Sequence, residues 1–265
     1  MTPRESVPVA ILCGGRGTRL RGDGPSLPKP LVEIGGHPIV WHVVRLYAAQ
    51  GFRRFLLLTG YRGEDIAAFA RDTDWGAGVE VECVDTGLDT PTGGRLHRVA
   101  GRLAGGTSCV TYADGLADID LGRLLRFHRE HEAPATVTVV RPELPFGVAR
   151  LDGDHVTGFV EKPRSDEWIN GGFLCLEPAA VAGIGPDDVL ERDPMERWAG
   201  EGALRAYRHE GFWDCMDTYK DAVLLNDLWR REQAPWAVES GAQGACSPLE
   251  ELAQGLALPT EERVG

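Results

Sequence analysis

The most constraining feature of the chain is a short apolar segment, residues 9–13, that runs directly into the glycine-rich sequence of residues 14–20. An apolar run of this length that ends in glycines predicts a strand buried on both faces of a parallel sheet. The loop after such a strand lies at its carboxyl end, where open α/β sheets bind their ligands. The segment therefore predicts an α/β fold with a ligand-binding loop after its first strand.

The composition of this loop is typical of a phosphate-binding site. The three glycines of residues 14–17 allow the backbone to approach an anion and to direct N–H groups at it. Arg16, Arg19 and Lys29 supply positive charge that can bridge phosphate oxygens. The loop is basic although the whole chain has a formal net charge of -12. This contrast predicts a small polyanionic ligand.

Two common phosphate-binding motifs do not match the loop. A P-loop requires Gly-x-x-x-x-Gly-Lys-Ser/Thr, which the sequence lacks, and the dinucleotide motif requires a third glycine where Leu20 stands. A different nucleotide-binding loop is the functional interpretation that remains. The structural alternative is a glycine-rich turn with solvated arginines.

Composition excludes several other classes of protein. The 43% hydrophobic and 26% charged content is that of an ordinary globular protein, and the pI near 5.1 disfavours a nucleic-acid partner. The sequence has no apolar stretch of membrane-spanning length and no secretory signal, so we expect a cytoplasmic protein with no membrane partner. Its six cysteines include no C-x-x-C pair and are expected to be small buried side chains.

Two sequence motifs are similar to those of a known family. Residues 13–20, Cys-Gly-Gly-Arg-Gly-Thr-Arg-Leu, and residues 28–36, Pro-Lys-Pro-Leu-Val-Glu-Ile-Gly-Gly, resemble the signature of the sugar-1-phosphate nucleotidylyltransferases. Within that family the chain most resembles the glucose-1-phosphate cytidylyltransferases, over residues 8–236. The resemblance implies a Rossmann-like, mostly parallel sheet flanked by helices, of the nucleotidyltransferase or GT-A type, with an antiparallel sugar-binding portion.

The order of predicted elements agrees with this fold and divides the chain. A helix over residues 38–50 between strands at 9–13 and 55–60 predicts a right-handed βαβ unit. Residues 146–160 change to a hairpin with an Asp-Gly turn. We predict one nucleotidyltransferase domain over residues 1–236, with a nucleotide-binding half (8–134) and a sugar-binding half (135–236). Residues 237–265 are predicted to be a flexible tail with a short helix.

Two aspartates are candidate ligands for Mg²⁺, which takes carboxylates together with phosphate oxygens. Asp114 follows a predicted strand at residues 108–112 and precedes a glycine. It could instead cap a helix, but Asp118 and Asp120 are better placed to cap the next one. Asp217 could be a first-turn acid of a helix, and the resemblance implies that it is the second metal ligand. His128 and His131 are expected to be satisfied or exposed rather than metal-bound.

The resemblance implies nucleotidylyl transfer, which needs positioning and charge neutralisation rather than a covalent nucleophile. The implied catalytic residues are Arg19, Lys29, Asp114, Lys162 and Asp217. The implied nucleotide-binding residues are Leu12, Cys13, Gly14, Gly15, Arg16, Gly17, Thr18, Lys29, Thr92, Gly93, Gly94 and Arg95. The implied sugar-phosphate-binding residues are Tyr112, Gly147, Glu161, Lys162, Asn170 and Gly171.

The expected substrates are a nucleoside triphosphate, CTP, and a sugar-1-phosphate, glucose 1-phosphate, with Mg²⁺ as cofactor in a homo-oligomer. Two departures from the cytidylyltransferase pattern leave alternatives open. Leu27 stands where these enzymes carry a second lysine, and the segment before Asp85 is shorter than theirs. The alternatives are transfer from GTP, UTP or dTTP to another sugar or cyclitol phosphate, a non-catalytic regulatory protein that binds sugar nucleotides, and a GT-A glycosyltransferase.

Overall fold

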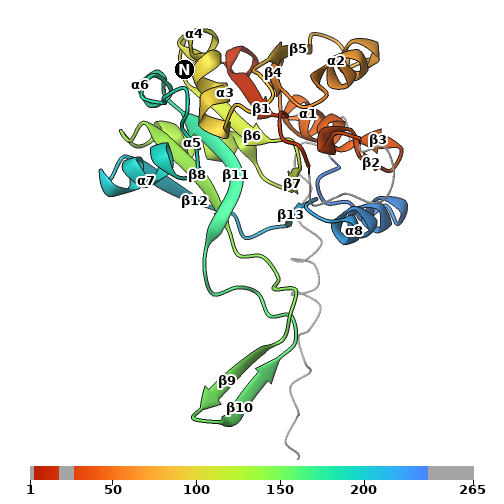
Figure 1. Cartoon of the computed structure of the whole chain (residues 1–265), viewed down its shortest axis with the longest axis vertical. Helices are drawn as coiled ribbons and strands as arrows, with labels where there is room; N and C mark the ends of the chain where they lie inside the picture. The colour runs from red at the N-terminus through yellow and green to blue at the C-terminus, as the bar shows by residue number, and fades with distance from the viewer. Residues whose placement is uncertain (1–2, 18–26, 238–265) are drawn as a thin grey trace, which may run out of the picture.

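The computed structural model describes residues 3–17 and 27–237, and its centre is a seven-stranded sheet flanked by helices (Figure 1). The strand order is β12-β8-β11-β6-β1-β4-β5, with β11 antiparallel to both of its neighbours and every other pair parallel. These strands are β1 (Pro8–Leu12), β4 (Arg54–Thr59), β5 (Glu80–Asp85), β6 (Ser108–Tyr112), β8 (Ala135–Val140), β11 (Ile169–Leu176) and β12 (Leu204–Arg208). The predicted α/β fold is confirmed.

Helices cover both faces of the sheet, which explains why the first strand is apolar throughout. Side chains of β1 alternate between two cores: Val9 and Ile11 belong to one, and Ala10 and Leu12 to the other. The helices are α1 (Ile39–Ala49), α2 (Gly63–Asp72), α3 (Thr92–Arg98), α4 (Ala100–Leu103), α5 (Leu121–Arg129), α6 (Pro178–Ala182), α7 (Asp193–Gly200) and α8 (Tyr219–Arg230), with 3₁₀ turns η1 (Arg4–Ser6) and η3 (Lys29–Leu31).

The first strands and helix form the predicted βαβ unit. β1 and β4 pair in parallel over five residues, from Pro8 with Arg54 to Leu12 with Leu58. Helix α1 connects them and buries Val40, Val43 and Val44 completely. Because both strands run the same way, the loop after β1 and the loop after β4 meet at one edge of the sheet. That edge is where the pocket described below lies.

Three two-stranded ribbons are added to the central sheet. They are β2 (Glu33–Ile34) with β3 (His37–Pro38), β7 (Gly115–Ala117) with β13 (Trp213–Cys215), and β9 (Val148–Asp152) with β10 (His155–Val160). The predicted hairpin is therefore confirmed. It lies within residues 141–168, here called the arm, and the β9–β10 ribbon projects well away from the body of the molecule (Figure 1).

Some local predictions are wrong in detail. Asp120 caps α5 by accepting a hydrogen bond from the Arg123 N–H at 2.8 Å, but Asp118 does not, because its carboxylate lies 3.0 Å from His209 Nε2. Thr92 and the two glycines after it form the first turn of α3. Thr218 and Asp221 form a capping box at the start of α8. Within the described residues, each helix is too short or too polar to cross a membrane.

Candidate functional site

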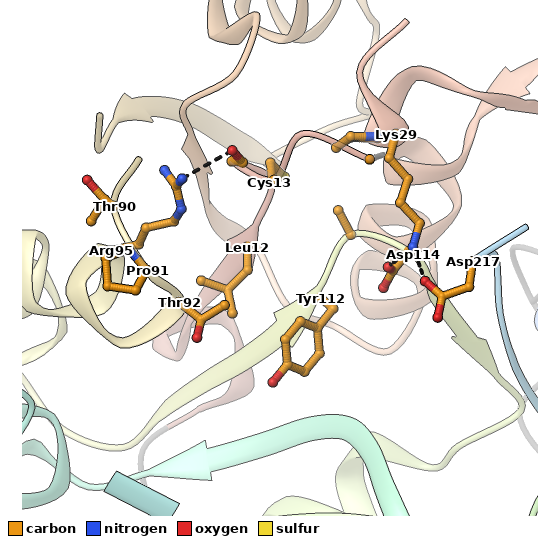
Figure 2. Close-up of a pocket in the computed structure, with 15 residues that line it drawn as sticks. Leu12, Cys13, Lys29, Thr90, Pro91, Thr92, Arg95, Tyr112, Asp114 and Asp217 are labelled. Carbon is orange, nitrogen blue, oxygen red and sulfur yellow. Dashed lines mark hydrogen bonds and ion pairs between the residues drawn. The ribbon is translucent and has the colours of Figure 1, made fainter. Parts of the chain in front are cut away.

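A pocket of ≈ 410 Å³ opens at the carboxyl ends of β1 and β6 (Figure 2). A smaller cavity of ≈ 160 Å³ lies beside it, and Tyr112, Asp114 and Asp217 line both. The larger pocket is also lined by the glycine loop and the start of α3: Leu12, Cys13, Gly14, Gly15, Gly17, Lys29, Pro30, Thr90, Pro91, Thr92, Arg95 and Ala113. The structure thus brings most of the predicted nucleotide-binding residues together.

The two predicted metal ligands lie side by side at the junction of these cavities. Asp114 is in the turn between β6 and β7, and Asp217 follows β13, which pairs antiparallel with β7. The pairing aligns Cys215 with Gly115, and the Met216 N–H donates to the Asp114 carbonyl oxygen at 2.9 Å. Backbone pairing therefore places together two carboxylates that are 103 positions apart in the sequence.

Lys29 lies between the two carboxylates. Its Nζ is 2.5 Å from Asp114 Oδ2 and 2.6 Å from Asp217 Oδ1 (Figure 2). Burial of the ammonium opposes its charge, but the carboxylates outweigh that effect and raise the pKa of Lys29. Lys29 is therefore protonated near neutral pH, and its ammonium forms an ion pair with each of the two carboxylates.

The donor set at this point fits a hard divalent cation. Both carboxylates direct an oxygen to one position, and Mg²⁺ usually takes one or two carboxylates and completes its shell with water and phosphate oxygens. No cluster of three or more His, Cys, Asp or Glu side chains suited to a metal occurs in residues 3–17 and 27–237. A metal held by Asp114 and Asp217 would thus take its other ligands from a bound phosphate or from water.

A buried arginine, Arg95, holds the glycine loop through hydrogen bonds to backbone carbonyl oxygens. The side chain of Arg95 is 4% exposed, and its guanidinium donates to the carbonyl oxygens of Gly14, Thr59 and Gly87 at 2.9–3.1 Å. A Cβ at Gly14 would lie 2.0 Å from Arg95 Cζ, so only glycine leaves room for this contact. Burial and the nearby Arg98 lower the pKa of Arg95. The resemblance implied that Arg95 binds nucleotide, and sequence analysis missed its role in holding three loops together.

Glu191 is a further residue that sequence analysis missed. Its carboxylate accepts hydrogen bonds from the Thr92 hydroxyl, at 2.7 Å, and from the Tyr112 hydroxyl. Burial and the Glu191 charge raise the pKa of Tyr112. Glu191 comes from an acidic loop before α7 whose sequence resembles an ordinary surface connection, and its partners lie 99 and 79 positions away. Local patterns could not have indicated this contact.

The predicted sugar-phosphate residues fall into two groups. Asn170 and Gly171 line the smaller cavity with Tyr112, and Trp213 Nε1 donates to the Gly171 carbonyl oxygen at 2.8 Å. The other three predicted residues, Gly147, Glu161 and Lys162, lie in the arm and line neither cavity as described. Glu161 and Gly147 are neighbours within the arm, because a Cβ added at Gly147 would lie 2.7 Å from Glu161 Oε2.

The remaining predicted residues lie at the edge of the pocket or outside the described chain. Arg16 forms an exposed ion pair with Asp89 at 2.7 Å, which connects the glycine loop to the loop after β5. Gly17 adopts a φ of +58°, a conformation that favours glycine. Thr18 and Arg19 lie outside the described residues, as does the predicted tail from residue 238 onward.

One of the two paired histidines and the described cysteines can be assigned from their surroundings. His128 is buried, with Nδ1 2.8 Å from the Thr136 hydroxyl and Nε2 3.0 Å from Glu177 Oε1. This confirms the prediction of a satisfied histidine. All five described cysteines are free, and three of them are buried. Cys246 lies outside the described residues.

Comparisons with known proteins show the family and the fold to which the chain is similar. The family described as Nucleotidyl transferase matches residues 9–194. A probable glucose-1-phosphate cytidylyltransferase of Bacillus subtilis (strain 168) is 36% identical over 87% of this chain and 99% of its own. A mannose-1-phosphate guanylyltransferase of Mycobacterium tuberculosis is 33% identical over 91% of this chain and 69% of its own. The crystal structure of HddC from Yersinia pseudotuberculosis complexed with GMP-PN has a TM-score of 0.67 at 20% identity, covering 84% of this chain and 99% of that one, which shows a shared fold.

Proposed function

Because the chain belongs to the nucleotidyl transferase family and is a sugar-1-phosphate nucleotidylyltransferase, we propose that it joins CTP to glucose 1-phosphate and releases pyrophosphate. A phosphate oxygen of the sugar phosphate attacks the α-phosphorus of the triphosphate. The bond from that phosphorus to the oxygen bridging to the β-phosphate breaks, and pyrophosphate leaves with the electron pair. The products are CDP-glucose and pyrophosphate.

The observation that carries the proposal is the Lys29–Asp114–Asp217 cluster at the junction of the two cavities. The glycine loop and Lys29 bind the triphosphate in the larger pocket, and Asn170 and Gly171 bind the sugar in the smaller one. The reacting phosphates then meet beside the carboxylates. Mg²⁺ held by Asp114 and Asp217 would neutralise charge on the phosphates, which otherwise repel each other.

The choice of CTP and glucose 1-phosphate is supported by identity to a cytidylyltransferase over nearly the whole of both chains. The guanylyltransferase relative keeps GTP and mannose 1-phosphate as an alternative pair, although this chain covers only 69% of it. Leu27 and the short segment before Asp85 also distinguish this chain from the cytidylyltransferase pattern. The non-catalytic and glycosyltransferase alternatives find no support among the relatives reported above.

A matrix of triphosphates against sugar 1-phosphates, scored by pyrophosphate release, tests the proposal. We expect CTP with glucose 1-phosphate to give the highest kcat/KM. Faster turnover of GTP, UTP or dTTP would reject the cytidylyl assignment and leave nucleotidylyl transfer standing. If no pair in the matrix releases pyrophosphate above the level of the Asp114→Asn variant, the proposed reaction is wrong.

We also propose that Glu161 and Lys162, which line neither cavity in this structure, contact the sugar phosphate when it is bound, as the family resemblance implies.

We further propose that the chain forms homo-oligomers. The arm exposes large apolar side chains, among them Phe146 at 76%, Leu151 at 65% and Phe159 at 64% exposure. A two-stranded ribbon is marginally stable alone in water, so a second copy packed on the arm supplies the missing apolar contacts. Light scattering on wild type and on a Leu151→Ser/Val156→Ser variant tests this. We expect the variant to form the smaller species, and a monomeric wild type would reject it.

A further inference from the structure

The Lys29 ammonium occupies the position where a divalent cation would sit. Its Nζ is within 2.6 Å of one oxygen from each of Asp114 and Asp217, and its side chain is only 15% exposed. The same two oxygens are the protein's ligands for a metal in the proposed function. A metal and an ammonium bound to the same oxygens repel each other strongly at such short range. One cation must therefore leave when the other enters.

We propose that Lys29 is an internal cation that keeps the carboxylate pair closed to divalent metal until a triphosphate arrives. The metal then binds together with the nucleotide and not before it. This inference rests on the proposed function, because it concerns how the same site receives its metal–triphosphate substrate. It adds an order of binding and a second role for Lys29.

The position of the lysine stem makes the exchange possible. The Lys29 backbone and Cβ lie beside the glycine loop, because a Cβ on Gly17 would be 3.0 Å from Lys29 Cβ. Only the far end of the side chain reaches the aspartates, and the residue lines the larger pocket. A lysine ammonium is a compact charge on a flexible four-carbon stem. Triphosphate oxygens at the glycine loop thus offer it a new partner within reach of the same stem.

The charges favour this order of events. The Lys29 ammonium offsets part of the negative charge of Asp114 and Asp217. The described part of the chain brings no third His, Cys, Asp or Glu side chain to this point, so a metal that arrives alone gains few ligands there and must displace a bound ammonium. A metal that arrives with the triphosphate brings additional oxygens for itself and for the lysine.

Titration with Mn²⁺ alone, without nucleotide or sugar phosphate, tests the inference, with bound Mn²⁺ followed by electron paramagnetic resonance. We expect wild type to bind Mn²⁺ weakly at this site and Lys29→Met to bind it at least 10-fold more tightly, since the Lys29 ammonium then no longer competes for the oxygens of Asp114 and Asp217. Lys29→Arg, which keeps the charge, should remain as weak as wild type. The double variant Lys29→Met/Asp114→Asn should bind Mn²⁺ no more tightly than wild type, which would assign the tighter binding of Lys29→Met to the two carboxylates.

A second readout does not depend on counting bound metal. Mn²⁺ should raise the melting temperature of Lys29→Met more than that of wild type, because it replaces the lost ammonium. Lys29→Gln serves the same purpose if Lys29→Met does not fold. Equal Mn²⁺ affinity in wild type and in the folded neutral variant would overturn the inference.

Failure of the inference can be told apart from failure of the proposed function. The Mn²⁺ titration contains no substrate, so it gives a result whether or not the protein turns over. If Lys29→Met binds Mn²⁺ more tightly than wild type but the wild type releases no pyrophosphate, the cation exchange is supported and the proposed reaction is rejected. If the wild type is active but binds Mn²⁺ tightly without nucleotide, the proposed reaction is supported and the cation exchange is rejected.

Discussion

The Met216 N–H donates a hydrogen bond of 2.9 Å to the carbonyl oxygen of Asp114. This backbone contact extends the β7–β13 pairing, which joins the turn after β6 to the segment after β13, and the Asp217 carboxylate lies beside that of Asp114. The candidate site therefore depends on pairing between two halves of the chain. Its geometry is set by backbone hydrogen bonds, so side chains within it can be changed while the fold survives.

The first prediction concerns the two carboxylates. Asp114→Asn and Asp217→Asn should each lower kcat by orders of magnitude, because the triphosphate charge is no longer neutralised during attack. Circular dichroism should show an intact fold in both variants, and excess EDTA should abolish wild-type turnover. Wild-type rates in EDTA would reject the metal-binding role of this pair.

The second prediction separates Lys29 from Lys162, which lie in the pocket and in the arm, respectively. Lys29→Ala should weaken binding of the triphosphate measured alone by about 1.5–3 kcal/mol, the usual contribution of a charge-assisted hydrogen bond. Lys162→Ala should leave that affinity nearly unchanged, raise the KM for the sugar phosphate and lower kcat. Calorimetry and steady-state kinetics on both variants measure these effects. An equal loss of triphosphate affinity would show that both lysines face the triphosphate.

The third prediction concerns the buried guanidinium under the glycine loop. Arg95→Met should destabilise the protein by about 2–4 kcal/mol, because the carbonyl oxygens of Gly14, Thr59 and Gly87 lose their donor. Triphosphate affinity should also fall, since the loop is no longer held. Arg102→Met is the matched control: it removes a half-exposed ion pair with Glu82 and should change stability by less than about 1 kcal/mol. Equal denaturation midpoints for the two variants would contradict this account.

The fourth prediction is an acid-dependent loss of stability caused by His42. Burial lowers the pKa of His42 from 6.5 to about 4, with Nε2 2.8 Å from the Ile34 carbonyl oxygen. Below pH 6.5 the unfolded chain takes up a proton that the folded protein does not accept until about pH 4. The free energy of unfolding should therefore fall as the pH drops through this window, by about 3 kcal/mol from this group.

Urea denaturation at pH 7.5, 5.5 and 4.5 measures the effect, with His42→Asn as the comparison. The difference in unfolding free energy between wild type and variant should be constant above neutral pH and shift in favour of the variant as the pH falls. Parallel pH profiles would show that His42 is not the titrating group. His155, which lies on the exposed arm, provides a control substitution that should leave the profile unchanged.

The sequence predicted those parts of the fold and site that depend on local patterns. The apolar run of β1, the helix α1 and the arm hairpin each follow from residues within one segment, and each is present. Asp118 was assigned wrongly because its partner, His209, lies 91 positions away. Glu191 and the loop contacts of Arg95 could not be predicted for the same reason. Long-range polar contacts leave no periodic trace in a sequence.

The central claim is that an oxygen of the sugar phosphate attacks the α-phosphorus beside Asp114 and Asp217. The direct test uses glucose 1-phosphate, or whichever sugar phosphate the substrate matrix selects, labelled with ¹⁸O on its phosphate. The ¹⁸O content of each product is then measured by mass spectrometry. The account predicts that the nucleotide sugar keeps all of the label and that pyrophosphate carries none. Label in the pyrophosphate, or a nucleotide sugar without it, would contradict the account.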